Sequence, residues 1–388
     1  MGSQPVVGHL VRGFVAPTET FIVNQIRSLR GFQPIVLCHH RLQQAPETFP
    51  VVALDQILAG RAALVDRLAY SVARQLPRAS ASLLATQAKS AGVSLLHFHY
   101  LVDARFFLAL KWLTGLPTVV SGYGYDVSSF PRRFLGYGRH CLKLLFRGME
   151  LVLAMSQDMR QDLLALGCPD QKIRVHYHGA DTGRFAFPER EYLDREEVTL
   201  LICGTLEIKK AQHLVLRALR LAEGDGLLRR RVRVELVGDG PMRRGLEEQV
   251  ASYNWRDRVR FAGHIPYEGD ALVQAYHRAD LFALPSITVK GDKEGIPGTI
   301  VEAMASGLPV LSSTHGGIPE IIESGRDGLL VREGDLDEMA RGLAELVNSS
   351  ALRQRLGRVA AERAARELGL QVRTRNLERI YAELLGNL

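Results

Sequence analysis

The sequence predicts an α/β protein with two parallel sheets, each covered by helices on both faces. Short apolar, β-branched runs alternate with longer stretches of helical period along most of the chain, which is the pattern of repeated strand, loop and helix units. The length of 388 residues fits two domains. A hydrophobic fraction of 46% and a mean hydropathy of −0.01 suffice for a large core and exclude disordered, collagen-like and disulfide-scaffold proteins.

The same patterns give the expected elements in chain order. In the first half we expect helices at residues 19–29 and through most of 56–91, and strands at 6–11, 34–38, 93–97 and 118–120. In the second half we expect strands at residues 198–203, 232–237, 258–262, 281–284, 309–312 and 328–331. Residues 336–388 are predicted to be helical, with Arg and Glu at spacings that allow i to i+4 pairs.

A polar, strongly charged stretch at residues 188–197 separates the two series of elements. It predicts a boundary between an N-terminal domain over residues 1–187 and a C-terminal domain over 188–365. A last helix, 366–388, is expected to pack back on the N-terminal domain. Open parallel sheets bind ligands beyond the carboxyl ends of their strands, so we expect the functional residues there.

Charge and cysteine usage narrow the class of protein. The net charge of +7 favours contact with something anionic, whether nucleic acid, a phosphate-rich ligand or a membrane surface. The four cysteines are far apart and form no C-x-x-C pair, so neither a disulfide framework nor a cysteine zinc site is predicted. Neither a signal-peptide pattern nor a bilayer-length apolar run is evident, and we expect a cytoplasmic protein.

The segment at residues 294–309 (E-G-I-P-G-T-I-V-E-A-M-A-S-G-L-P) carries the most chemical information. Its Gly and Pro residues open a helix near Thr299, and the free amides at such a helix start can hold an anion. Glu294 and Glu302 would lie on either side of that anion. The alternative is an ordinary capping box, Thr299-x-x-Glu302, with Glu294 as a solvated loop acid. The amides in question are those of Gly298, Thr299 and Ile300.

Together with residues 312–320 (S-S-T-H-G-G-I-P-E), this segment resembles the signature of retaining family 4 glycosyltransferases, enzymes of the GT-B fold. In that family an E-x7-E pair, matched here by Glu294 and Glu302, contacts the donor sugar and the nucleotide ribose respectively. The resemblance covers nearly the whole chain. It implies two Rossmann-like, doubly wound domains that face each other across a cleft.

Three further segments of the second half resemble the family's donor site. Residues 204–211 (G-T-L-E-I-K-K-A) look like the G-R-L-x-x-x-K-G loop, whose arginine and lysine bind the donor diphosphate. Lys210 matches the lysine, whereas Thr205 replaces the arginine and Ala211 the last glycine. A solvated lysine at a helix start and a plain strand-to-helix turn are the alternatives. The implied donor-binding positions, which include the glycine turn and the base-cradling segment, are Gly204, Thr205, Gly238 and Ile265.

Two segments of the first half are candidates for the acceptor side of the cleft. Residues 17–22 (P-T-E-T-F-I) look like the P-x-S-E-T-F motif of exopolysaccharide and colanic-acid type members, although Thr18 and Glu19 could equally be an N-cap and its first-turn acid. His97 and His99 close a strand and share one face of it. Metal binding is conceivable for such a pair. With no third ligand nearby in the sequence, we expect no metal and instead hydrogen bonds into the cleft.

Residues 121–127 (S-G-Y-G-Y-D-V) resemble the family's H-G-x-D segment. Tyr123 stands where histidine is usual, near the reactive end of the sugar. A phenol can donate a hydrogen bond, but with an unperturbed pKa of about 10 it replaces an imidazole poorly at neutral pH. Asp126 keeps its family position, with a helix or turn cap as the alternative role.

A basic, partly amphipathic segment follows at residues 130–147. Such segments can lie on anionic membrane surfaces, whereas the alternative is a core helix with a solvated basic face. The first alternative would bring the protein to the inner face of the membrane. Nucleic acid is not expected, because no binding module accompanies the charge. The basic residues are Arg132, Arg133, Arg139, Lys143 and Arg147.

The resemblance therefore implies a retaining hexosyltransferase that uses a nucleotide-diphosphate sugar, with UDP favoured over GDP. The acceptor would be a sugar, lipid-linked or small-molecule hydroxyl in polysaccharide, glycolipid or glycoside biosynthesis. The expected catalytic residues are Glu294, Lys210, Tyr123 and Asp126, with no cofactor and no metal. The alternatives are a phosphorylase or a sucrose- or trehalose-type synthase of the same fold, and a noncatalytic nucleotide-sugar-binding partner.

Overall fold

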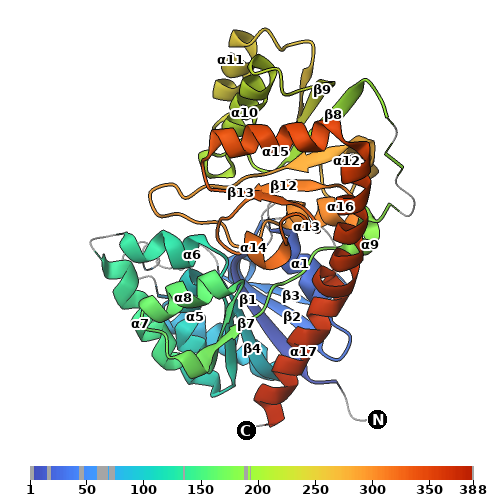
Figure 1. Ribbon diagram of the computed structural model, residues 1–388. Helices are drawn as coiled ribbons and strands as arrows, with labels where there is room; N and C mark the ends of the chain where they lie inside the picture. Colours follow the sequence, from blue (N-terminus) through green and yellow to red (C-terminus); the bar gives the residue numbers. More distant parts are fainter. Residues whose placement is uncertain are drawn as a thin grey trace. The chain divides into compact units, whose positions relative to one another are not determined.

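The computed structural model describes residues 4–14, 19–42, 48–58, 69, 75–133, 136–187, 191–192 and 194–386. The chain forms two compact units (Figure 1). Unit 1 is Met1–His178 with Leu370–Leu388, and unit 2 is Gly179–Gly369. The predicted boundary at residues 187/188 lies inside unit 2, because Phe185 is fully buried there and its carbonyl accepts a hydrogen bond from Ser306 Oγ at 2.9 Å.

Unit 1 contains a seven-stranded sheet in which every neighbouring pair is parallel. The four expected strands are confirmed, and three short ones are added, two of them at the sheet edges. The order reverses direction beside β1, which is the switch point where open α/β sheets bind ligands. In spatial order the strands are β3 (Val51–Ala53), β2 (Gln33–Arg41), β1 (Val6–Phe14), β4 (Val93–His99), β5 (Thr118–Ser121), β6 (Leu151–Ala154) and β7 (Ile173–Val175).

Helices connect these strands, and the last helix of the chain belongs to the same unit. Leu377 and Tyr381 of that helix are fully buried in a cluster with Val7, Leu95 and other apolar residues of the sheet. The helices are α1 (Thr20–Arg27), α2 (Leu54–Ile57), α4 (Arg78–Ser90), α5 (Leu101–Thr114), α6 (Tyr125–Ser128), η1 (Phe130–Arg132), α7 (Tyr137–Gly148), α8 (Gln157–Ala165), η3 (Asp170–Lys172) and α17 (Leu370–Gly386).

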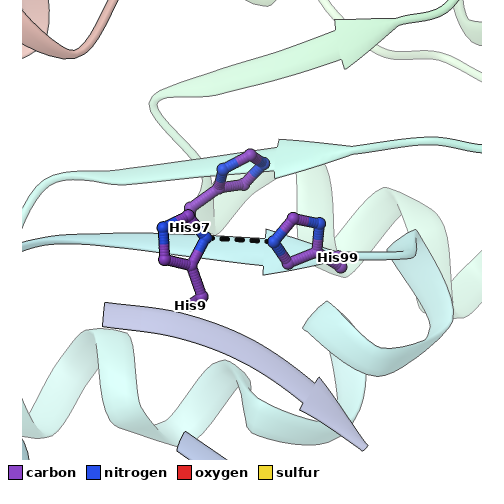
Figure 2. A group of neighbouring side chains, drawn as sticks. All are labelled: His9, His97 and His99. Atoms are coloured by element: carbon purple, nitrogen blue, oxygen red, sulfur yellow. Dashed lines mark hydrogen bonds between the residues drawn. The ribbon is translucent and has the colours of Figure 1, made fainter. Parts of the chain in front are cut away.

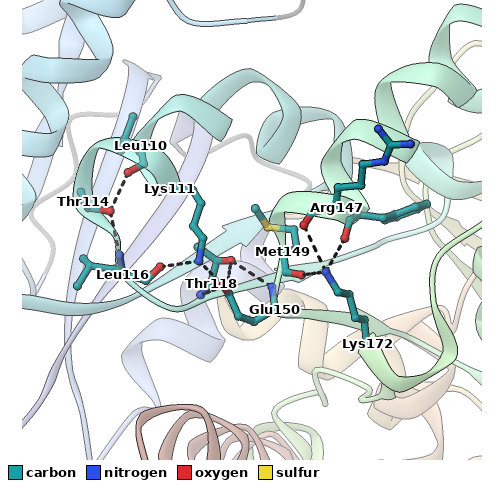
Figure 3. Close-up of polar contacts among 10 residues, drawn as sticks. Leu110, Lys111, Thr114, Leu116, Thr118, Arg147, Met149, Glu150 and Lys172 are labelled. Carbon is teal, nitrogen blue, oxygen red and sulfur yellow. Dashed lines mark hydrogen bonds and ion pairs between the residues drawn. The ribbon is translucent and has the colours of Figure 1, made fainter. Parts of the chain in front are cut away.

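Polar contacts fix the connections on either side of β5 and β6 (Figure 3). Lys111 pairs with Glu150 and donates to the Leu116 carbonyl at 3.1 Å, while Glu150 accepts from the Thr118 amide at 2.8 Å. Lys172 donates to the carbonyls of Phe146 at 2.8 Å and Met149 at 2.6 Å, at the C-terminal end of α7. A cation at this position satisfies carbonyls that the helix leaves without partners.

The basic segment at residues 130–147 contains η1 and the amphipathic helix α7. Cys141, Leu142, Leu145 and Phe146 form its buried face, so α7 packs against the core of unit 1. The five basic side chains, Arg132, Arg133, Arg139, Lys143 and Arg147, are exposed. Across the described ranges, no helix is long and apolar enough to cross a membrane.

Unit 2 contains a six-stranded parallel sheet. All six expected strands are confirmed, in the order β10 (Val259–Gly263), β9 (Arg231–Val237), β8 (Glu197–Cys203), β11 (Leu281–Ala283), β12 (Val310–Ser313) and β13 (Leu329–Val331). Its helices are α9 (Thr182–Phe185), η4 (Ile208–Lys210), α10 (Gln212–Gly224), α11 (Arg243–Ser252), α12 (Asp270–Arg278), α13 (Gly298–Ala305), α14 (Ile318–Ile321), α15 (Leu336–Asn348), α16 (Ser350–Arg363) and the π-helix η5 (Ala364–Leu368).

The strand order of unit 2 reverses between β8 and β11, which are paired neighbours. Because β8 and β11 are parallel neighbours, the residues that follow their carboxyl ends lie at the same edge of the sheet. Lys210 follows β8 and Glu294 follows β11.

Candidate functional site

Lys210 and Glu294 meet at this edge of unit 2. The Nζ atom of Lys210 donates to Oε2 of Glu294 at 2.7 Å. The Nζ atom of Lys209 lies 3.3 Å from Oε1 of the same carboxylate and 3.2 Å from Oδ2 of Asp292. Sequence reasoning proposed Lys210 and Glu294 separately. It missed Asp292 and gave Lys209 no site of its own, although the adjacent lysines were a visible signal.

The charges of this cluster stabilise one another. Burial opposes the negative charge of Glu294, but Lys210 and then Lys209 outweigh burial and lower the pKa of Glu294 to about 2. Burial likewise opposes the charge of Lys209, and Glu294 and Asp292 nevertheless raise its pKa. At neutral pH the cluster therefore holds ammonium groups that are already oriented, and such groups can stabilise an anion without reorganisation.

His315 holds the backbone of Glu294 in place. Its Nε2 accepts from the Glu294 amide at 3.0 Å, so its proton is on Nδ1, which donates to Glu333 at 2.8 Å. Gly316 has a φ of +51°, and a Cβ there would lie 2.3 Å from the Glu294 carbonyl oxygen. This close approach requires glycine. His315 and Glu333 are supporting residues that the sequence analysis did not assign.

The start of α13 differs by one amide from the expectation. The helix begins at Gly298, after Pro297, and Ile300 donates its amide to the Pro297 carbonyl at 3.1 Å. The prediction that the Ile300 amide is free is therefore wrong. Gly298 and Thr299 occupy the first two helical positions, where an α-helix offers no internal acceptor for the amide.

Thr299 and Glu302 do not form a capping box. No side chain caps α13, and Thr299 Oγ1 is buried without a hydrogen-bond partner in the described part of the chain. The Glu302 carboxylate instead accepts from the Tyr276 hydroxyl at 2.7 Å. Burial raises the pKa of Glu302 to about 7, and the Tyr276 hydrogen bond and Arg184 only partly oppose this shift. The Glu302 carboxyl is therefore held by Tyr276 and does not cap the start of α13.

The loops after β8, β9 and β10 lie against one another at the same edge. Gly204 donates its amide to the Val237 carbonyl at 3.0 Å, and Gly238 donates to Gly263 at 2.8 Å. A Cβ on Gly238 would lie 2.1 Å from the Gly204 carbonyl oxygen, so the two loops can approach only with glycine there. Thr205 follows Gly204 and accepts at its carbonyl from Gln212 at 2.9 Å, while Ile265 follows β10 and is half-buried.

On unit 1, the predicted acceptor residues are only partly described. Thr18 lies outside the described residues. Glu19 is the residue before α1 and makes no side-chain cap bond, so its alternative role as an acid of the first helical turn is wrong. Its carboxylate hydrogen-bonds to Tyr100, and burial first and this neighbour second raise the pKa of Tyr100.

Asp126 anchors the loop that carries Tyr123. Its Oδ1 accepts from the Tyr123 amide at 2.9 Å and its Oδ2 from the Leu101 amide at 2.7 Å. Burial raises the pKa of Asp126, and these amides oppose the rise. The carboxylate thus acts as the turn cap that was its alternative role, and a direct catalytic part for it stays a prediction.

His97 and His99 are fully buried, and the expectation that they hydrogen-bond into the cleft stays a prediction. They hydrogen-bond inside unit 1, His97 to Ser121 at 2.8 Å and His99 to Tyr123 at 2.8 Å. A third histidine, His9 of β1, lies beside them because β1 and β4 pair in register (Figure 2). Sequence reasoning missed His9, because nothing in the sequence indicates which strand neighbours β4.

Each of the three rings offers one nitrogen, and these nitrogens all lie within 4.8 Å of one another, which is close enough for one metal ion to be coordinated by all three. The rings of His97 and His99 are stacked, with centroids 4.3 Å apart, so their nitrogens point side by side. His9 Nε2 is the one ring nitrogen of the cluster without a hydrogen bond to a described residue. No acidic or thiol ligand joins the group among the described residues, so a divalent charge would be buried without an anion. The arrangement suits hydrogen bonding better, and the absence of a metal stays a prediction.

Both halves of the chain match known protein families. Residues 19–184 match Glycosyltransferase Family 4, and residues 184–363 match Glycosyl transferases group 1. The chain is 30% identical over 373 residues to the putative colanic acid biosynthesis glycosyltransferase WcaL of Escherichia coli, covering 87% of this chain and 89% of that protein. It is 34% identical over 264 residues to the amylovoran biosynthesis glycosyltransferase AmsK of Erwinia amylovora, covering 68% of this chain and 63% of that protein.

The match to the WcaL protein of Salmonella typhimurium is 34% identical over 259 residues and spans 66% of this chain and 61% of that protein. Among solved structures, Anabaena Alr3699/HepE in complex with UDP superposes with a TM-score of 0.76 at 18% identity, covering 98% of this chain and 100% of that one. The chain therefore belongs to glycosyltransferase family 4 and has the GT-B fold.

Proposed function

We propose that this enzyme transfers a hexosyl group from a nucleotide-diphosphate sugar, UDP-linked by preference and GDP-linked as the second choice, to an acceptor hydroxyl with retention of configuration. The observation that carries the proposal is the contact of Glu294 with Lys210 and Lys209 at the switch point of unit 2. In a family 4 chain, this cluster offers both a positive site for a diphosphate and a carboxylate for the sugar.

In this account the donor binds along the carboxyl edge of the unit 2 sheet. Lys210 and the amides of Gly298 and Thr299 face the diphosphate, and Glu302 holds the ribose. The backbone around Gly204, Gly238 and Ile265 cradles the base. Negative charge grows on the diphosphate as the sugar departs, so donors that are fixed beforehand favour the transition state most. Thr205 supplies one neutral hydrogen bond where the family usually has arginine.

Glu294 contacts the sugar, and Tyr123 donates a hydrogen bond near its reactive end. We assign no enzymatic nucleophile and favour substitution on the same face of the sugar. Asp126 supports the reaction by holding the Tyr123 backbone through its two amide contacts. Glu19, with Thr18 before it, is proposed for the acceptor side, and His97 and His99 act there through Ser121 and Tyr123.

The relatives support a role in polysaccharide biosynthesis, with glycolipid or glycoside synthesis as the wider class. The WcaL and AmsK proteins are named for colanic acid and amylovoran biosynthesis. A lipid-linked acceptor would suit the exposed basic residues of η1 and α7, which could hold the enzyme at an anionic membrane surface. The experiment described next compares lipid-linked acceptors with sugar and small-molecule acceptors.

The test is mass spectrometry of the products formed from UDP-, GDP- and ADP-sugars with lipid-linked and soluble acceptors. Transfer with release of a nucleoside diphosphate, at least about tenfold slower in Glu294→Gln, is the expected result. Glu345→Gln, an exposed glutamate of the same unit, is the matched control. Turnover that requires inorganic phosphate would indicate a phosphorylase instead. Nucleotide binding without transfer to any acceptor would indicate a noncatalytic partner.

A further inference from the structure

Two chains of hydrogen bonds in unit 1 end at the Tyr123 hydroxyl. The first begins on α17, where the Tyr381 hydroxyl bonds to Nδ1 of His97. Nε2 of His97 bonds to Ser121 Oγ at 2.8 Å. Burial raises the pKa of Tyr123, and the Ser121 hydroxyl, which comes next in this chain, opposes the rise. Tyr381, His97 and Ser121 are all buried.

The second chain starts on β1. Nδ1 of His9 bonds to Nε2 of His99 at 3.1 Å, and Nδ1 of His99 bonds to the Tyr123 hydroxyl at 2.8 Å. Figure 2 shows the His9 and His99 rings joined by this bond, with the His97 ring beside them. Nε2 of His9 has no hydrogen-bond partner within the described ranges.

All three histidines are neutral at physiological pH. Burial lowers the pKa of His9 to about 3 and lowers the pKa values of His97 and His99 well below their ordinary range. A neutral imidazole carries one N–H and one lone pair. Each ring must therefore donate on one side and accept on the other, which makes both chains directional.

The unpartnered nitrogen sets the direction of the second chain. If Tyr123 donated to His99, then His99 would donate to His9, and the His9 proton would be on Nε2 with no acceptor. The reverse direction puts the protons on Nδ1 of His9 and of His99 and leaves only a lone pair at Nε2 of His9. Buried donors without acceptors are rarer than buried acceptors without donors, so the reverse direction is favoured.

The same rule sets the direction of the first chain. If Tyr123 donated to Ser121, then Ser121 would donate to His97 and His97 to Tyr381. The buried Tyr381 hydroxyl would then lack an acceptor, because His97 is its one hydrogen-bond partner in the described part of the chain. In the opposite direction Tyr381 donates to His97, His97 to Ser121, and Ser121 to Tyr123, so each of these three buried donors has an acceptor and the unpaired proton is that of the half-buried Tyr123.

We propose that both chains donate to the Tyr123 oxygen, so that the Tyr123 proton points away from them and is reserved for an oxygen atom of the bound donor sugar. Tyr381, His97 and Ser121 on one side, and His9 and His99 on the other, are positioning residues. Two donated hydrogen bonds polarise the phenol and strengthen its own O–H as a donor. This assignment gives a physical basis for a tyrosine at a position where the family usually has histidine, and it rests on the proposed function.

Histidine tautomers test the assignment on the unmodified chain. We would record long-range ¹H–¹⁵N spectra of the ¹⁵N-histidine protein at pH 7.5, with single substitutions to assign each ring. The expected protons are on Nδ1 of His9 and His99 and on Nε2 of His97. A proton on Nε2 of His99 would overturn the proposal, since Tyr123 would then donate to His99. Stoichiometric zinc or another transition metal in the purified protein would also overturn it, because the ring nitrogens would be metal ligands.

Kinetics test the donor role. Tyr123→Phe is expected to lower kcat about tenfold or more, with nucleoside diphosphate affinity unchanged within about twofold. Tyr381→Phe should lower kcat about threefold or more, whereas Tyr253→Phe in unit 2 is the matched control and should not. His99→Asn, whose amide can donate from the place of Nδ1, should retain more activity than His99→Leu.

These results separate the proposal from the proposed function. Full activity of Tyr123→Phe would overturn the donor role even with the expected tautomers. A wild-type protein that turns over no nucleotide sugar would refute the proposed function, and with it the donor role, while the tautomers would still decide the direction of the two chains.

Discussion

The buried carboxyl of Glu302 should make the stability of unit 2 depend on pH in a way that one substitution removes. Burial raises the pKa of Glu302 from its ordinary value of 4.5 to about 7. Because the folded-state pKa is higher than the unfolded one, the folded state favours the protonated carboxyl. The resulting stability is fully present below pH 4.5 and is lost as the pH rises through about 7.

The size of the effect follows from the two pKa values. Proton linkage gives an unfavourable contribution to folding of about 0.8 kcal/mol at pH 5 and about 3.3 kcal/mol at pH 8. Glu302→Gln keeps an acceptor for the Tyr276 hydroxyl but cannot ionise. The stability of this variant relative to wild type should therefore increase by about 2.5 kcal/mol between pH 5 and pH 8.

Urea unfolding followed by Trp255 fluorescence measures this difference. Trp255 is buried in unit 2, whereas the other tryptophan, Trp112 in unit 1, is 67% exposed and would be replaced by Phe in every sample. Glu345→Gln controls for the loss of an exposed carboxylate in the same unit. A Glu302→Gln advantage that stays constant within about 0.5 kcal/mol from pH 5 to pH 8 would refute the reasoning, because the carboxyl would then titrate normally.

Three further predictions concern charged groups of the two units. Thr205→Arg should tighten nucleoside diphosphate binding about tenfold unless Lys209 already fills that role, and Lys210→Ala should weaken it; calorimetry that finds normal binding in both variants would mean that this loop does not face the diphosphate. EDTA should leave turnover unchanged, since Lys210 and the α13 amides can neutralise the leaving group, and a loss of activity that Mn²⁺ or Mg²⁺ restores would count against this. The enzyme should bind anionic liposomes at low salt and release at high salt; cosedimentation that survives replacement of Arg132, Arg133 and Arg139 by Ser would show that these basic residues of the 130–147 segment are not the contact.

Hydrophobic period was sufficient to predict most of the sheets. Each predicted strand exists. A strand that is buried on both faces needs a short, continuous apolar run, and such runs can be recognised in the sequence. The strands that were missed are short: β3 (Val51–Ala53) and β7 (Ile173–Val175) have three residues each, and β6 (Leu151–Ala154) has four. Length alone does not explain the omission, because β11 (Leu281–Ala283) and β13 (Leu329–Val331) are equally short and were predicted.

The candidate site was predictable as a set of residues but not as a set of contacts. Lys210 and Glu294 are 84 residues apart, and their contact depends on the order of β8 and β11 in the sheet. The pairing of β1 with β4 likewise brings His9 beside His97. Local rules also misjudged the start of α13, where the spacing of Thr299 and Glu302 suits a capping box and burial of Glu302 against Tyr276 prevents it.

Nucleoside diphosphate affinity, measured by calorimetry beside kcat for Glu302→Ala and Glu294→Ala, tests the proposed donor site most directly. Glu302→Ala should weaken binding about tenfold, because ribose contacts persist from the ground state to the transition state. Glu294→Ala should bind the free nucleotide at least as tightly as wild type, since it releases Lys210 and Lys209 from their shared carboxylate, and should mainly lose kcat. Wild-type nucleotide affinity in Glu302→Ala, together with unchanged turnover in Glu294→Ala, would contradict the proposal that this edge of unit 2 binds the donor.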